Sequence, residues 1–129
     1  MAADTPVIWY PRGSPTGVRL DEPMQFIKNP YSGAGTQREV QWQVASDSGF
    51  GAATIVFDTD LRENDDHWLG DDWVDFIFPN AVGPLAANTT YYVRCRVRNT
   101  SSETSNWSST VQFTTEATVG TAADWRAAQ

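Results

Sequence analysis

Two segments of the chain alternate strictly between apolar and polar positions. In residues 89–99 apolar side chains occupy every second position and arginines stand between them: Tyr91, Val93, Cys95 and Val97 against Arg94, Arg96 and Arg98. In residues 38–45 the same alternation sets Val40, Trp42 and Val44 against Glu39, Gln41 and Gln43. Because successive side chains of a β-strand point to opposite faces, both segments are predicted strands with one core face and one solvated face.

Shorter stretches rich in β-branched and aromatic residues predict further strands. They are residues 53–58, 73–79 and 107–115, and in the N-terminal third residues 7–10, 17–20 and 23–27. Segments rich in Gly, Pro, Asn and Ser separate them as turns at 13–15, 29–35 and 47–49. Strands at this spacing, without helical patterns between them, predict an all-β fold: an antiparallel sandwich or barrel of about seven strands.

The chain has 129 residues, which is the size of one domain. We expect the sandwich to occupy residues 6–116, with an N-terminal arm at 1–5 and a C-terminal arm at 117–129. The C-terminal arm contains helix formers around Trp125, but the run is too short to be a stable helix by itself.

Charge and composition exclude several classes of function. Sixteen acidic and nine basic residues give a net charge of -7, which argues against a nucleic-acid binder and against docking on an anionic membrane. The apolar runs are too short to span a bilayer, and the start at Met1 has no pattern of a signal peptide. A single cysteine, Cys95, excludes an internal disulfide and a cysteine-based metal site, and we expect no cofactor.

Three segments together resemble a fibronectin type III domain. Residues 85–97 resemble its strand F, in which a tyrosine, here Tyr91, folds its hydroxyl back onto the backbone just upstream. Residues 40–45 resemble strand C, with Trp42 as the core tryptophan, and residues 105–115 resemble strand G. The resemblance implies a two-sheet antiparallel β-sandwich. It implies a core between the sheets that contains Trp42, Tyr91, Val93, Val97 and Phe113.

The row of arginines is open to two interpretations. It could bind an anion or an acidic glycan, or it could be a solvated sheet face. In the fold that the resemblance implies, strands C and F are neighbours, so Arg94, Arg96 and Arg98 can pair with Glu39, Gln41 and Gln43. The net acidity of the chain favours the solvated face.

Residues 58–75 form the second candidate, because they hold eight of the sixteen carboxylates. Carboxylate oxygens are available for Ca²⁺, but the spacing of an EF-hand is missing. We favour a solvated loop between two strands. Aromatic residues in loops are common at interfaces, so Trp68 and Trp73 are candidate contacts for a partner.

Catalysis finds little support in the sequence. His67 is the only histidine, and no serine lies in a nucleophile elbow. Cys95 is predicted to face the core, where a thiol behaves as a small hydrophobe. We therefore expect a protein that is not an enzyme.

A solitary sandwich of this kind resembles the decoration, cement or fibre proteins of bacteriophage particles. This reading predicts a virion protein that binds a capsid or tail lattice, or copies of itself, through Trp9, Tyr10 and Trp125. The alternative is a spacer or weak carbohydrate-binding module from a bacterial surface protein or polysaccharide-degrading enzyme. Such an extracellular module would bind glycans through Trp68, Trp73 or Tyr92.

Overall fold

The computed structural model of the chain describes residues 3–18, 24–64, 69–76 and 85–116. These residues form seven β-strands and one short 3-10 helix, and no α-helix occurs among them. The strands are β1 (Ile8–Tyr10), β2 (Met24–Lys28), β3 (Gln37–Ala45), β4 (Ile55–Asp58), β5 (Trp73–Phe76), β6 (Thr90–Asn99) and β7 (Val111–Thr114), and the helix is η1 (Ala52–Thr54). The predicted all-β class is confirmed.

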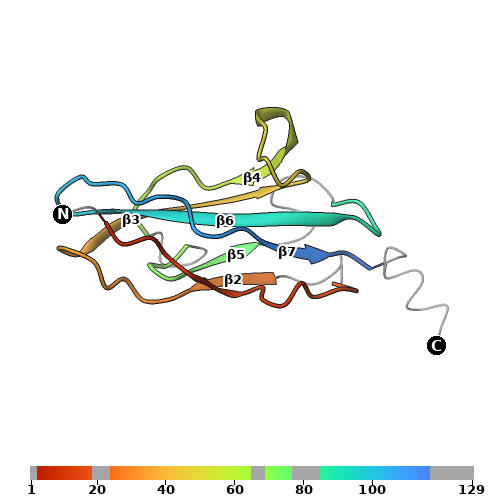
Figure 1. Cartoon of the computed structure of the whole chain (residues 1–129), viewed down its shortest axis with the longest axis horizontal. Helices are drawn as coiled ribbons and strands as arrows, with labels where there is room; N and C mark the ends of the chain where they lie inside the picture. Colours follow the sequence, from red (N-terminus) through yellow and green to blue (C-terminus); the bar gives the residue numbers. More distant parts are fainter. Residues whose placement is uncertain (1–2, 19–23, 65–68, 77–84, 117–129) are drawn as a thin grey trace.

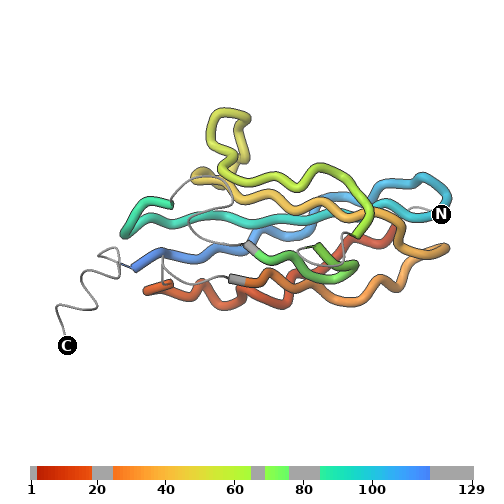
Figure 2. The backbone as a smooth tube through the Cα atoms, turned by 180° about the vertical axis from the view of Figure 1, so that it is seen from behind, coloured from red at the N-terminus to blue at the C-terminus, as the bar shows by residue number. Residues whose placement is uncertain are grey.

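The strands form two antiparallel sheets that face each other as a sandwich rather than a barrel. One sheet has the order β1-β2-β5 and the other the order β4-β3-β6-β7. Figure 1 shows β2 and β5 in one layer and β3, β4 and β6 in the other. The connection between β3 and β4 projects from this body in both Figure 1 and Figure 2.

The central pair of the larger sheet follows the alternation in the sequence. Strand β3 pairs with β6 in a register that sets Glu39 opposite Arg98, Gln41 opposite Arg96 and Gln43 opposite Arg94. The predicted neighbourhood of these two segments is therefore confirmed. Their apolar positions point into the space between the sheets, where they are almost completely buried.

Aromatic rings join the two sheets across the core. The ring of Phe26 on β2 lies 5.9 Å from that of Trp42 on β3 and 6.1 Å from that of Phe113 on β7. Phe113 in turn stacks on Tyr91 at 5.8 Å. Val93 and Val97 are also fully buried. Because these side chains come from both sheets, their burial holds the layers together.

Several strand ends differ from the prediction. Residues 52–54 form η1, so β4 begins only at Ile55, and β7 begins at Val111 rather than at Trp107. Val18, inside the predicted strand 17–20, makes only an isolated bridge with Thr115. The last residues of the predicted strands 17–20 and 73–79 lie outside the described residues, as does Pro23. In the predicted N-terminal arm, Ala3 is buried and Asp4 accepts a hydrogen bond from Ser32.

The outward face of β3 is less solvated than predicted. Gln41 and Gln43 are only 6% and 8% exposed. Strand β4 brings Asp58 beside them, and the arginines of β6 cover them from the other side. Alternation indicates the face of a residue correctly, but it does not indicate what covers that face.

Tyr91 forms the predicted contact with the backbone upstream of its strand. The amide of Ala86 donates a hydrogen bond of 2.8 Å to the Tyr91 hydroxyl. This bond ties the connection before β6 to the strand itself, while the Tyr91 ring remains in the core.

Replacing Tyr91 with phenylalanine is expected to lower the free energy of unfolding by about 0.5–1.5 kcal/mol, because the ring keeps its packing and only one hydrogen bond is lost. Urea denaturation of the Tyr91→Phe variant measures the change. Tyr92→Phe is the matched control, because Tyr92 points to the opposite face of the same strand. An equal loss in both variants would contradict a specific role of the Tyr91 hydroxyl.

Candidate functional site

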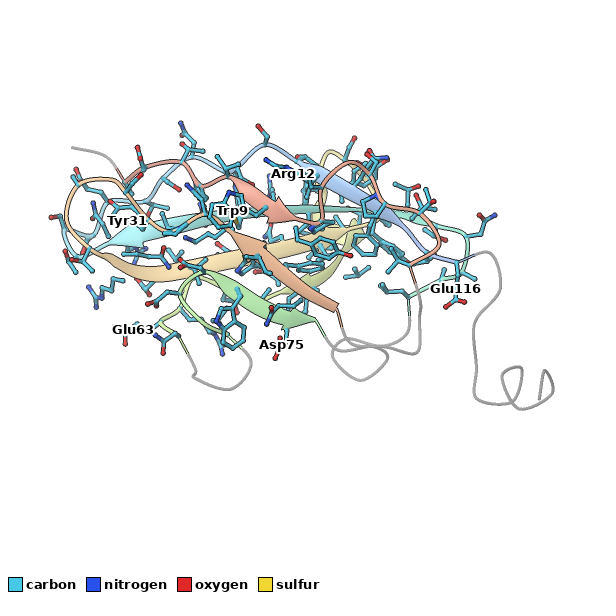
Figure 3. All side chains as sticks on the ribbon, turned by 90° about the horizontal axis from the view of Figure 1, so that it is seen from below. Trp9, Arg12, Tyr31, Glu63, Asp75 and Glu116 are labelled. Atoms are coloured by element: carbon cyan, nitrogen blue, oxygen red, sulfur yellow. The ribbon has the colours of Figure 1, made fainter. Side chains whose placement is uncertain are left out.

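The outer face of the three-stranded sheet carries the first candidate surface. Along β2, Phe26 and Lys28 are buried and point inward, and on β5 Val74 does the same. Ile27 lies between Phe26 and Lys28, and Trp73 is the neighbour of Val74, so both side chains point outward. Ile27 and Trp73 are directly opposite each other in the register of the two strands. In Figure 3 this sheet faces the viewer.

A β-bulge adds two further aromatic side chains to the same face. Ile8 pairs with Lys28, but Tyr10 pairs with Ile27, so β1 advances by two residues where β2 advances by one. In such a bulge two residues oppose one partner and the side chains are re-aimed. Trp9 and Tyr10 are accordingly both open to solvent, at 48% and 42% exposure. Trp9 is labelled on β1 in Figure 3.

These residues form one continuous surface, which we call the aromatic strip. Tyr10, Ile27 and Trp73 make a row across all three strands, because Ile27 is the register partner of both others. Trp9 lies beside the row at the bulge. The strip therefore consists of Trp9, Tyr10, Ile27 and Trp73. Sequence reasoning singled out its three aromatic members but not their common row.

A polar pair borders the aromatic strip. Gln25 and Asp75 are register partners two positions along the same strands. The Gln25 side-chain amide donates a hydrogen bond of 3.0 Å to the Asp75 carboxylate. The strip thus has hydrogen-bonding groups beside its apolar surface. Neither residue was recognised as a contact in the sequence, because no local motif marks them.

The indole of Trp73 is held in place by a tight turn. Leu69 and Val74 form a bridge across this turn, and the Gly70 amide donates a hydrogen bond of 2.9 Å to the Trp73 carbonyl. The indole lies so close to Gly70 that a Cβ atom added there would clash with it. A side chain at position 70 would therefore have to displace the indole from this place. Trp68, Trp125 and His67 lie outside the described residues.

The outer face of the four-stranded sheet is closed by its own side chains. Arg94 donates two hydrogen bonds to the side-chain oxygen Oε1 of Gln43, and Arg96 donates one to Oε1 of Gln41. Both glutamines donate in turn to the two carboxylate oxygens of Asp58, at 2.8 and 2.9 Å. At the end of the row, Arg98 forms an ion pair with Glu39.

Aromatic rings complete this cover. The Arg94 guanidinium lies 4.1 Å from the ring centre of Phe50 and 4.0 Å from that of Trp107, and Arg96 lies 4.5 Å from Trp107. Burial and the neighbouring Arg96 lower the pKa of Arg94, whereas Asp58 raises it. The arginines already contact side-chain amide oxygens, a carboxylate and aromatic rings. This face is therefore held together by its own side chains and is not an open anion site.

Replacing Trp107 with alanine is expected to lower the free energy of unfolding by about 1–2 kcal/mol, because two cation–π contacts are lost. Thermal and urea unfolding measure the effect. Trp9→Ala is the matched control, since Trp9 is half exposed and a surface substitution of this kind changes stability by about 0.5 kcal/mol or less. A Trp107 variant as stable as the Trp9 variant would contradict this role.

The carboxylates of the acidic stretch are dispersed. Asp58 binds Gln41 and Gln43, Asp71 accepts a hydrogen bond from Asn64, and Glu63 pairs with Arg38. Among the described residues, no group of three or more acidic, histidine or cysteine side chains is placed to hold a metal ion. Asp65 and Asp66 lie outside those residues.

Two reactive side chains lie inside the sandwich. Lys28 is 1% exposed, and its ammonium donates to the Asn29 carbonyl at 2.9 Å and to Asp72 at 3.2 Å. Burial raises the pKa of Cys95 to about 12, although Lys28 and Ser108 act in the opposite direction. The thiol is therefore protonated at neutral pH and is a poor nucleophile.

No helix in the described part of the chain combines the length and the apolar character of a membrane span.

Comparison with known proteins gives a likeness in fold. No family model and no curated protein matches the chain. A Streptomyces avermitilis alpha-L-rhamnosidase, crystallised with L-rhamnose, matches 89% of the chain with a TM-score of 0.59 and 24% identity. An alpha-L-rhamnosidase from Dictyoglumus thermophilum matches 98% of it with a TM-score of 0.67 and 15% identity. The chain covers only 10% and 13% of the lengths of those two proteins. It is thus a β-sandwich domain whose fold recurs as a small part of two bacterial alpha-L-rhamnosidases.

Proposed function

We propose that this chain is a non-catalytic β-sandwich module of a larger carbohydrate-degrading protein and that it works outside the cell. The observation that carries the proposal is that both matched structures are glycoside-cleaving proteins, in which a sandwich of this fold makes up about a tenth of the chain. A module of this kind spaces or anchors a catalytic domain. The comparisons lend no support to the virion component that the sequence favoured.

The chemistry of the described residues supports a role without catalysis. Cys95 is buried with a raised pKa, and the carboxylates of Asp58 and Asp72 are engaged by amides and by Lys28. By contrast, the aromatic strip presents two exposed side chains, Trp9 and Tyr10, and two half-buried ones, Ile27 and Trp73, to solvent, as a contact surface does. We therefore assign the strip, rather than a pocket, to the work of the module. No cofactor is required for it.

Two experiments test this function. Sequencing the DNA on both sides of the coding region should find a catalytic domain for glycoside cleavage, in the same reading frame or next to it. Capsid or tail genes at those positions would overturn the proposal in favour of a virion protein. The isolated chain should also release no p-nitrophenol from p-nitrophenyl α-L-rhamnoside, and release that depends on chain concentration would overturn its non-catalytic character.

A further inference from the structure

We infer that the aromatic strip binds an uncharged polysaccharide, with the sugar chain lying across the strands of the three-stranded sheet. This inference rests on the proposed function and names the ligand of its contact surface. It follows from four properties of the surface: its aromatic chemistry, its rigidity, its polar border and its charge.

The chemistry of the strip fits a sugar ring. A pyranose has C–H groups on its faces and hydroxyl groups around its rim, so it pairs with a flat aromatic face next to hydrogen-bonding groups. Trp9 and Tyr10 offer such faces at 48% and 42% exposure. The row from Tyr10 to Trp73 crosses two strand spacings, which is about 10 Å. That length favours an oligomeric sugar over a single ring.

The aromatic strip is also pre-organised for binding. Its members lie on paired strands rather than on long loops, and the Trp73 indole packs against the backbone of Gly70. Large side chains held in this way lose little conformational freedom when a ligand arrives, which favours affinity. Ile27 fills the centre of the row and keeps it continuous.

The border of the strip supplies hydrogen bonds. Gln25 and Asp75 lie two residues along their strands from Ile27 and Trp73, a distance of about 7 Å. Gln25 is exposed, and its amide is oriented by the Asp75 carboxylate at 3.0 Å. Sugar hydroxyl groups can donate to this carboxylate while the ring rests on the aromatic side chains.

The negative charge of the chain and the prolines beside β1 restrict the class of ligand. The chain carries a net charge of -7, and Asp75 stands on this face, so an anionic polysaccharide is repelled. Proline at positions 6 and 11 flanks β1 on both sides, and prolines on an edge strand hinder the addition of a further strand. Addition of an extended peptide at the β1 edge is therefore disfavoured, and an uncharged sugar polymer fits this face best.

Affinity gel electrophoresis of the whole chain tests the inference. Separate gels contain galactomannan, hydroxyethyl cellulose or, as the anionic probe, polygalacturonate. We expect retardation in at least one of the two neutral gels and none in polygalacturonate. Trp9→Ala and Trp73→Ala should each weaken the binding about tenfold or more, as loss of a central aromatic contact does. Tyr92→Ala is the control, because Tyr92 lies on the outer face of the other sheet.

Each other outcome overturns the inference. Free migration in both neutral gels, retardation in polygalacturonate alone, or equal binding by the Trp9 and Tyr92 variants would each do so. Concentration-dependent dimers in sedimentation that Trp9→Ala abolishes would assign the strip to self-association instead. Trp9 is half exposed, so its variant remains folded even if Trp73→Ala does not. A coding region fused to a catalytic domain, together with failed binding, would leave the module as a spacer and refute only this inference.

Discussion

Replacing Trp42 with alanine is expected to lower the free energy of unfolding by about 3–5 kcal/mol, since a fully buried large aromatic side chain leaves a cavity that the core fills only in part. Trp42 has no exposed surface, and its ring packs on Phe26 of the opposite sheet at 5.9 Å. A domain of this size has about 5–15 kcal/mol of stability in total. The variant should therefore unfold at a much lower urea concentration.

Urea denaturation followed by circular dichroism measures this change. Trp42→Phe is the internal control, because it keeps an aromatic ring between the sheets and should cost less than alanine. A loss of less than about 1 kcal/mol in Trp42→Ala, the size of an ordinary substitution, would show that the core is not built around this indole.

The second large effect is expected at the buried ammonium of Lys28. Within residues 3–18, 24–64, 69–76 and 85–116, Asp72 is the only carboxylate beside this ammonium, so Asp72→Ala leaves the Asn29 backbone carbonyl as its partner there. A hydrogen bond to a charged group contributes about 1.5–3 kcal/mol to the free energy of unfolding, and its loss leaves a buried charge without its partner of opposite sign. Since the Asp72 side chain is 39% exposed, we expect a value towards the lower end of that range.

Lys28→Met is the matched variant for this prediction. It removes the charge itself and keeps a side chain of similar length in the interior, so it should change stability by about 1 kcal/mol or less. Asp72 then faces solvent and is rehydrated. Comparison of the two urea midpoints gives the result. A Lys28→Met variant that is less stable than Asp72→Ala would mean that the ammonium contributes to the fold, rather than being tolerated within it.

The sequence predicts the larger sheet well, for a simple reason. Strands β3 and β6 each have one apolar and one polar face, so the two-residue period appears directly in the chain. The arginine row and its partners on β3 follow from that period once the two strands are neighbours. The burial of Gln41 and Gln43 does not follow from that period, because it depends on the pairing of β4 with β3, which places Asp58 beside them.

The aromatic strip could be predicted only in part. The sequence marks Trp9 and Tyr10 as candidate lattice contacts and Trp73 as an aromatic residue of the acidic stretch 58–75. Their meeting in one row depends on the register of three strands and on a bulge in β1, and neither is encoded locally. For Trp107 the prediction from the sequence is wrong. The sequence pattern places it in the last strand, but it lies before β7 and covers Arg94 and Arg96.

The two outer faces of the sandwich therefore differ in a way that bears on function. One is closed by its own arginines, glutamines and rings, so its hydrogen-bonding capacity is largely used within the chain. The other leaves tryptophan and tyrosine side chains open to solvent beside a polar pair. We propose that the module adheres through the open face and that the closed face serves the stability of the fold.

An NMR titration with neutral manno- and cello-oligosaccharides tests this adhesion, because each tryptophan indole N–H gives its own signal. Adhesion through the three-stranded sheet predicts that the indole signals of Trp9 and Trp73 shift on titration, while those of Trp42 and Trp107 stay in place. Shifts confined to Trp107, or a spectrum in which neither Trp9 nor Trp73 responds, would contradict it.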